Sequence, residues 1–128
     1  MKIILTSVFV NDQEKALEFY TEKLGFVKKQ DVSLGEFKWL TVVSPDQLNG
    51  TELLLEPNNN PVSLAFQKGI FDQGIPAASF GVDDIHAEYE KLKSLGVKFT
   101  MEPTKAGPVI IAVFEDTCGN LIQMMQTY

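Results

Sequence analysis

The chain has one cysteine, Cys118, and one histidine, His86, among its 128 residues. A single cysteine excludes an internal disulfide, and we therefore expect a reducing, cytoplasmic location. No window approaches the roughly 20 apolar residues of a membrane-spanning helix, and the N-terminal residues lack the pattern of a signal peptide. We therefore expect a globular protein with no membrane partner.

Basic residues are also few, because 11 Lys and Arg stand against 17 Asp and Glu, a formal net charge of −6. These basic residues do not cluster along the chain, so we expect no nucleic-acid partner. An acidic balance favours solubility and, weakly, neutral or cationic ligands. The 45% hydrophobic fraction is typical of a globular domain and excludes a disordered or fibrous chain.

An internal repeat is the main feature that the sequence does contain. A valine and an aspartate precede a helix-like run that ends in Leu-Gly, and the pattern occurs twice. The offset is 72 residues from Val10 to Val82 and 71 from Gly25 to Gly96. Each half alone is too small to bury much core, so the two copies are expected to pack together.

Hydrophobic periodicity predicts the same order of elements, β-α-β-β-β, in each half. The halves cover about 1–57 and 76–128, and the helices follow the capping residues Asp12 and Asp84. Linker 58–75 is expected to hold a short helix near 62–68, and to wrap the core or line a dimer contact. Residues 116–120 predict a hairpin turn in which Gly119 takes a positive φ. The expected strands are 2–10, 26–33, 36–43, 51–56, 77–82, 97–101, 109–114 and 121–125.

Three motifs occur in order over nearly the whole chain. They are Val10-x-Asp12 with Ala16-Leu-Glu-Phe-Tyr20 and Lys23-Leu-Gly-Phe26, then Val82-Asp83-Asp84 with Leu95-Gly96-Val97, then Phe114-Glu-Asp116-x-x-Gly119-Asn120. Together they resemble the vicinal oxygen chelate superfamily, which includes glyoxalases, bleomycin-resistance proteins and extradiol dioxygenases. The resemblance implies an α+β fold. In it, paired βαβββ modules form a cupped, incomplete barrel, usually within a homodimer.

The resemblance also implies four metal-ligand positions on four strands. In this sequence they fall on Leu5, Glu56, Ala77 and Gln123, with Glu52 as the alternative to Glu56. Catalytic zinc needs about three protein ligands, and non-haem iron sites need two histidines and a carboxylate. Only the glutamate is a strong donor, and the single histidine cannot supply the missing nitrogens. We therefore expect no metal and no other cofactor.

Several side chains are candidates for the wall of a ligand pocket. Glu56 is the best candidate for a general base or for a carboxylate that holds a cation, and the alternative is a solvated residue at a strand end. A buried amide such as Gln123 needs a hydrogen-bonding partner, which is either a ligand or a neighbour. The remaining candidates are more typical of a core than of a pocket wall, and they are Phe37, Trp39, Thr41, Met101 and Phe114.

Other reactive residues favour no catalytic chemistry. His86 is expected on the solvated side of its helix, and no Lys or Arg flanks Cys118 to activate its thiol. We therefore interpret the chain as a metal-independent protein that binds a small hydrophobic or cationic molecule in a dimer-associated pocket. The alternatives are a glyoxalase-like lyase or isomerase, a dioxygenase with a degenerate site, and a scaffold dimer.

Overall fold

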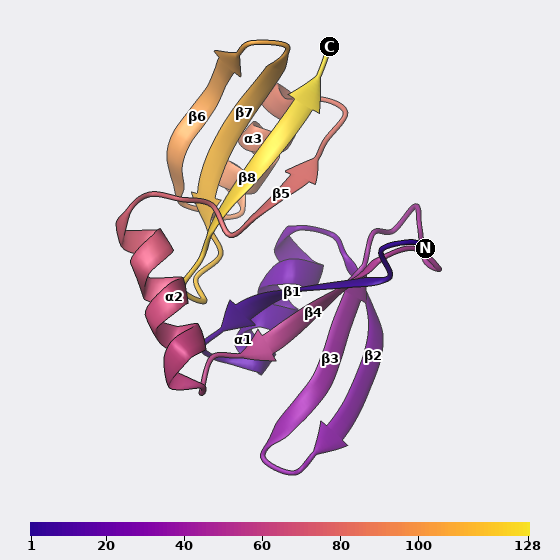
Figure 1. Cartoon of the computed structure of the whole chain (residues 1–128). Helices are drawn as coiled ribbons and strands as arrows, with labels where there is room; N and C mark the ends of the chain where they lie inside the picture. Colours follow the sequence, from indigo (N-terminus) through magenta and orange to yellow (C-terminus); the bar gives the residue numbers. More distant parts are fainter.

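The computed structural model describes all 128 residues as two similar modules with a helix between them (Figure 1). The first module contains β1 (Leu5–Val10), α1 (Gln13–Glu18), the π-helical turn η1 (Phe19–Lys23), β2 (Val27–Leu34), β3 (Phe37–Val43) and β4 (Glu52–Pro57). The connecting helix is α2 (Pro61–Asp72). The second module contains β5 (Ala78–Gly81), α3 (Ile85–Ser94), β6 (Phe99–Ala106), β7 (Val109–Glu115) and β8 (Leu121–Thr127).

The two sheets have the same topology. Their strand orders are β1-β4-β3-β2 and β5-β8-β7-β6, in which the first pair is parallel and the others are antiparallel. The sheets do not join, so β1 and β5 each keep one edge without a strand partner. The α+β fold of paired βαβββ modules expected from the sequence is confirmed, and the barrel is open.

The two helices of the repeat begin at a capping aspartate and end before a glycine. The carboxylates of Asp12 and Asp84 each accept a hydrogen bond of 3.1 Å from the backbone N–H three residues later. These bonds satisfy N–H groups that the first turn of a helix leaves free. Gly25 and Gly96 follow the helices with φ values of +83° and +87°, which an L-residue rarely adopts.

Three elements differ most from the sequence expectation, while β1 starts at Leu5 rather than at residue 2 and β8 extends to Thr127. The first helix is not continuous, because its last turn widens into η1, which lets the adjacent Phe19 and Tyr20 both enter the core. The helix in the linker is longer than expected, because Asn60 caps it and Pro61 occupies its first turn. Strand β6 continues to Ala106 because it pairs with β7 in a hairpin along this length. None of the helices combines the length and apolar character that crossing a membrane requires.

One hydrophobic core serves both modules. Helices α1 and α3 each cover one face of a sheet, and 18 buried residues form a single cluster between and beneath them. The Phe19 and Phe114 rings lie 6.2 Å apart, and those of Phe26 and Phe80 lie 5.0 Å apart. Since each pair joins one module to the other, the modules are packed together through their helix-covered sides.

A buried carboxylate fixes this packing. Asp116, in the turn between β7 and β8, is fully buried and accepts a 2.7 Å hydrogen bond from the Tyr20 hydroxyl of the other module. It also accepts bonds from the backbone N–H groups of Cys118 and Asn120 and from the Asn120 amide. The Gln67 amide of α2 donates to the Cys118 carbonyl, to the Phe9 carbonyl and to the Asn120 side chain. The turn is therefore held by β1, η1 and α2 together.

We expect Gly119→Ala to destabilise the protein by about 2–3 kcal/mol, measured by urea unfolding. Gly119 has a φ of +100°, as the sequence predicts for this turn, and a Cβ there would lie 2.6 Å from Gln67 Nε2. The control is Gly69→Ala in the middle of α2, where a Cβ meets no atom within 4 Å. This control should stabilise by about 0.5–1 kcal/mol. Equal effects of the two substitutions would contradict the packing described for the turn.

Candidate functional site

Each sheet has one face that no helix covers. In the first sheet Leu53 and Leu55 pack in the core, so the intervening side chains of β4 point to the helix-free side. Alternation on the neighbouring strands adds further residues to this surface. We call it the N-terminal face, and its residues are Leu5, Ser7, Phe9, Gln30, Val32, Leu34, Phe37, Trp39, Thr41, Glu52, Leu54 and Glu56.

Glu52 is the carboxylate on this face that neighbouring side chains hold in place. One of its oxygens, Oε1, accepts hydrogen bonds of 2.6 Å from both the Thr41 hydroxyl and the Gln30 amide. The other oxygen, Oε2, has no protein partner. The bonds from Gln30 and Thr41 lower the pKa of Glu52 below its usual value. Glu52 is therefore an ionised carboxylate that two hydrogen bonds fix in place. Its second oxygen is free, and the residue is half-buried.

Glu56 occupies a different part of the same face. The register pairs Leu5 with Glu52 and Phe9 with Glu56, so the carboxylate beside Leu5 is that of Glu52. Strands β3 and β4 separate near Glu56, where the Gln13 amide inserts and donates to the carbonyls of Lys38 and Leu55. Glu56 makes no hydrogen bond or ion pair within the chain. Of the two glutamates weighed from the sequence, Glu52 has the organised environment.

The second sheet has a corresponding helix-free surface, the C-terminal face, which includes Ser79, Met101, Ile111, Gln123 and Met125. The Gln123 amide donates to the Ser79 hydroxyl at 2.9 Å, so its partner within the chain is a neighbour in the same sheet. Met101 lies opposite Val113 and is 40% exposed. Apart from Phe114, the candidate pocket residues are thus divided between the helix-free faces of two separate sheets.

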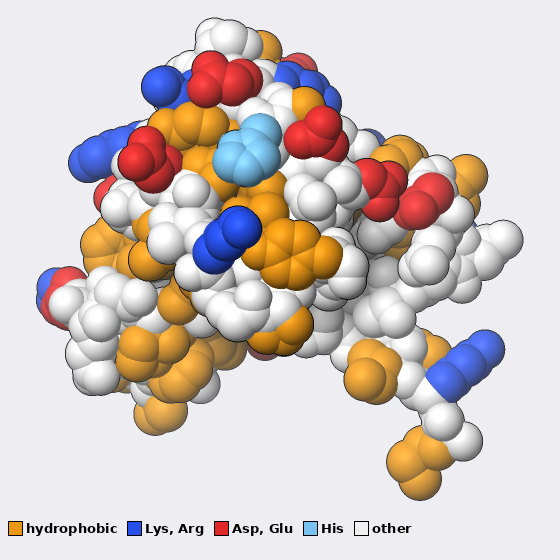
Figure 2. Space-filling view, turned by 90° about the horizontal axis from the view of Figure 1, so that it is seen from above, with side chains coloured by type: hydrophobic (Ala, Val, Ile, Leu, Met, Phe, Trp, Pro, Cys, Tyr) orange, Lys and Arg blue, Asp and Glu red, His pale blue; other side chains and the backbone are white.

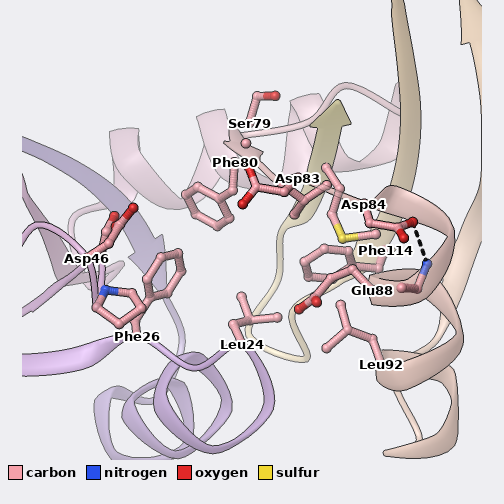
Figure 3. A pocket seen from close by; sticks show the side chains of 16 residues that line it. Leu24, Phe26, Asp46, Ser79, Phe80, Asp83, Asp84, Glu88, Leu92 and Phe114 are labelled. Atoms are coloured by element: carbon pink, nitrogen blue, oxygen red, sulfur yellow. Dashed lines mark hydrogen bonds between the residues drawn. The ribbon is translucent and has the colours of Figure 1, made fainter. Parts of the chain in front are cut away.

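Phe114 lies on the helix-covered side of β7, away from both faces. It is 1% exposed and contributes to a cleft between the two modules (Figure 3). The cleft has a volume of about 770 Å³ and is bounded by the end of η1, the loop after β3, the end of β5 and the start of α3. Its lining is aromatic and aliphatic inside, with four carboxylates, Asp46, Asp83, Asp84 and Glu88.

The side chains at the four positions that the resemblance assigns to metal ligands do not form a metal-binding set. Leu5 and Ala77 have no donor atom, and the Gln123 amide is bonded to Ser79. Glu52 and Glu56 lie on the first sheet, whereas Gln123 lies on the second. No group of three or more His, Cys, Asp or Glu side chains lies together in a way that could hold a metal ion. His86 is exposed on α3, on a surface that also carries Asp and Glu side chains (Figure 2).

Cys118 lies in the turn between β7 and β8, and its side chain is fully buried. Burial, together with the charge of Asp116, raises the pKa of the Cys118 thiol to about 11. Burial and Asp116 also raise the pKa of Tyr20 well above its usual value. Both groups are therefore neutral at physiological pH, and Cys118 is a buried thiol rather than a nucleophile.

Sequence reasoning missed two contributors to the site, Gln30 and Gln13. Gln30 stands on a strand face with Val32 and Leu34, and a polar residue in an otherwise apolar row is the signal that could have identified it. Gln13 had no such signal, because its partners Lys38 and Leu55 are distant in sequence.

Comparison with known proteins gives consistent relatives over the whole chain. YurT of Bacillus subtilis, an uncharacterized protein, is 64% identical over 98% of this chain and 99% of its own. A probable lactoylglutathione lyase of Synechocystis sp. is 30% identical over 99% of this chain and 96% of its own. The crystal structure of TnmS3, an antibiotic binding protein from Streptomyces sp. CB03234, superposes with a TM-score of 0.80 at 28% identity, covering 100% of this chain and 97% of that one.

The family model for the Glyoxalase/Bleomycin resistance protein/Dioxygenase superfamily matches residues 2–124. This range includes both modules, the connecting helix and nearly all of β8. The chain therefore belongs to the glyoxalase/bleomycin resistance protein/dioxygenase superfamily.

Proposed function

We propose that this protein binds a small hydrophobic molecule with a cationic or hydrogen-bond-donating group, without a metal ion. The observation that carries the proposal is Glu52, whose Oε1 is held by Thr41 and Gln30 while Oε2 stays free. A carboxylate fixed in this way loses little conformational freedom when it binds a donor. The antibiotic-binding relative TnmS3 supports a binding role for this architecture.

The surroundings of Glu52 favour an apolar, planar body for the ligand. Trp39 and Phe37 are half-buried on the same face, and neighbouring Val32 and Leu34 are 50% and 62% exposed. Flat aromatic surfaces stack against rings and attract cations through their π-electrons. Glu56 adds a second negative charge toward the far end of β4. Together these groups favour an aromatic cation over an anion.

We propose that the binding protein is a homodimer in which a second copy closes the open faces. The edges of β1 and β5 are free, and the residues that lead into β1 are exposed and apolar, with Ile3 and Ile4 77% and 65% accessible. Such an edge is a ready template for another chain. In the dimer, the N-terminal face of one copy would lie against the C-terminal face of its partner and enclose the ligand.

The proposal excludes the metal-dependent chemistry suggested by relatives such as the Synechocystis lyase. That chemistry needs several nitrogen or oxygen donors around one ion, and the corresponding side chains here include Leu5 and Ala77. A proton transfer by Glu52 would require a carboxyl pKa near neutrality, whereas hydrogen bonding lowers the pKa of Glu52. We therefore propose binding without turnover. A reducing cytoplasm suits the buried free thiol of Cys118.

Fluorescence of Trp39, the only tryptophan, provides the test. At neutral pH, 9-aminoacridine is a cation and acridine is mostly neutral, so they form a matched pair of probes. We expect both to quench Trp39 and the cation to bind more tightly. Glu52→Gln should weaken the cation about fivefold to tenfold, since it removes about 1–1.4 kcal/mol, and should change acridine less than about twofold.

The glutamine substitution keeps an oxygen that can accept from Thr41 and Gln30, so it removes charge with little structural change. Glu22→Gln on the exposed side of η1 is the matched control and should change neither affinity. Because the pKa of Glu52 is lowered, the affinity for 9-aminoacridine should persist below neutral pH and fall only as pH drops through that lowered pKa. Equal losses for cation and neutral probe, or none in either, would contradict the role of Glu52.

A further inference from the structure

We infer a second binding site, separate from the helix-free faces, in the cleft between the modules, and its ligand class is an aryl or alkyl amine. The cleft volume of about 770 Å³ lies in the range of small-molecule pockets. Phe80, Phe114 and Met124 reach the cleft from the helix-covered side of the second sheet, and only Ser79 is shared with the C-terminal face. Glu52 and Trp39 lie on the helix-free side of the first sheet and do not line the cleft. The inference therefore does not depend on the function proposed above.

The interior of the cleft is suited to an apolar group. Figure 3 shows the rings of Phe26 and Phe80 close together on one side, and the side chains of Leu24, Leu92 and Phe114 on the other. The Phe26 and Phe80 rings are 5.0 Å apart in an edge-to-face arrangement. Aromatic rings arranged in this way accept an apolar or aromatic group by dispersion and can also face a cation.

The charged residues around the cleft favour a positively charged ligand. No Lys or Arg lines it, whereas Asp46 comes from the first module and Asp83 from the second. Neither of these two carboxylates makes an ion pair or a hydrogen bond within the chain. The other acidic residues are partly engaged, since Asp84 caps α3 and Glu88 lies 3.7 Å from Lys91.

Asp46 and Asp83 are exposed carboxylates that line the cleft from different modules. A cation bound in the cleft is attracted by these carboxylates, while an anion would be repelled. Figure 3 shows the carboxylates of Asp83 and Glu88 at the cavity, beside the apolar side chains. An amine with a hydrophobic group fits both the carboxylates and the apolar side chains. Its ammonium would lie at the carboxylates, and its hydrophobic group would lie against the rings.

Methionine methyl groups distinguish this site from the helix-free faces. Met124 lines the cleft, whereas Met101 and Met125 belong to the C-terminal face. The full chain is labelled with ¹³C-methyl methionine and titrated with 4-phenylbutylamine or with its neutral analogue 4-phenylbutanol. We expect the amine to shift the Met124 resonance while Met101 and Met125 stay unchanged, and we expect the alcohol to bind at least about fivefold more weakly.

Asp83→Asn should weaken the amine about threefold to tenfold and leave the alcohol unchanged. Asp83 is exposed and without a partner, so this change should not disturb folding. Glu90→Gln, on the exposed side of α3 outside the cleft, is the control and should alter neither affinity. Shifts confined to Met101 and Met125, equal affinity for the two probes, or an unchanged affinity in Asp83→Asn would each overturn the inference.

Discussion

Asp116→Ala should cost about 3–5 kcal/mol in the free energy of unfolding, measured by urea titration followed by circular dichroism. The Asp116 carboxylate is fully buried and accepts four hydrogen bonds, from Tyr20, from the Cys118 backbone and twice from Asn120. Removing the carboxylate leaves these donors buried without a partner. A domain of this size has a total stability of only about 5–15 kcal/mol, so the loss is a large share of the whole.

Because Asp116→Ala can fail to fold, Tyr20→Phe provides the second variant. It removes one hydroxyl that donates to Asp116 at 2.7 Å and should cost about 1.5–3 kcal/mol. Tyr89→Phe is the matched control, since the Tyr89 hydroxyl makes no hydrogen bond within the chain and its loss should stay within about 0.5 kcal/mol. If the two phenylalanine variants unfold at the same urea concentration, the carboxylate does not hold the modules together.

Ile4→Lys should convert the proposed dimer into a monomer, with the dissociation constant raised at least about a hundredfold. The Ile4 side chain is 65% exposed in the single chain, while its carbonyl accepts a 2.9 Å bond from the Glu52 backbone. The side chain is thus presented in a fixed position beside the free edge of β1. Burying an isoleucine is worth about 1.5–3 kcal/mol, and a symmetric interface counts it twice.

Val62→Lys provides the control for the dimer experiment. Val62 is 77% exposed, but it lies on α2 rather than at a sheet edge. Analytical ultracentrifugation should therefore give a dimer for Val62→Lys and a monomer for Ile4→Lys, with circular dichroism unchanged in both. A dimer that survives Ile4→Lys but dissociates in Val62→Lys would place the interface on α2. It would remove the basis for a ligand enclosed between two copies.

The fold was predictable because its signals are local. Asp12 and Asp84 cap helices within three residues of themselves, and Gly25 and Gly96 end the same helices in the left-handed region. Alternating apolar residues then define the faces of the strands, and the repeat indicates that the two halves share a structure. The widened turn η1 was not predictable, because it depends on the core that receives Phe19 and Tyr20.

The candidate site was only partly predictable because register is not local. Alternation places Glu52 and Glu56 on one face but cannot tell which of them lies beside Leu5. That choice depends on the parallel pairing of β1 with β4, which joins residues 47 positions apart, as in Leu5 opposite Glu52. The same limitation applies to Phe114. The sequence suggested it as a pocket residue, but the structure places it in the cleft between the modules.

The role of the Asp116 motif illustrates a further limit. Asp116, Gly119 and Asn120 contributed to the family resemblance, but their partners were not visible in the sequence. Tyr20 lies 96 residues before Asp116, and Gln67 lies 53 residues before Asn120. The motif therefore joins the two modules through buried hydrogen bonds.

The metal content of the purified protein shows whether it binds its ligand without a metal ion. The protein is purified without chelator and analysed by inductively coupled plasma mass spectrometry for zinc, nickel, manganese and iron. We expect far less than one equivalent of any of these metals per chain, and 9-aminoacridine binding that is unchanged by added chelator. A stoichiometric, tightly held divalent cation whose removal abolishes ligand binding or turnover would contradict it.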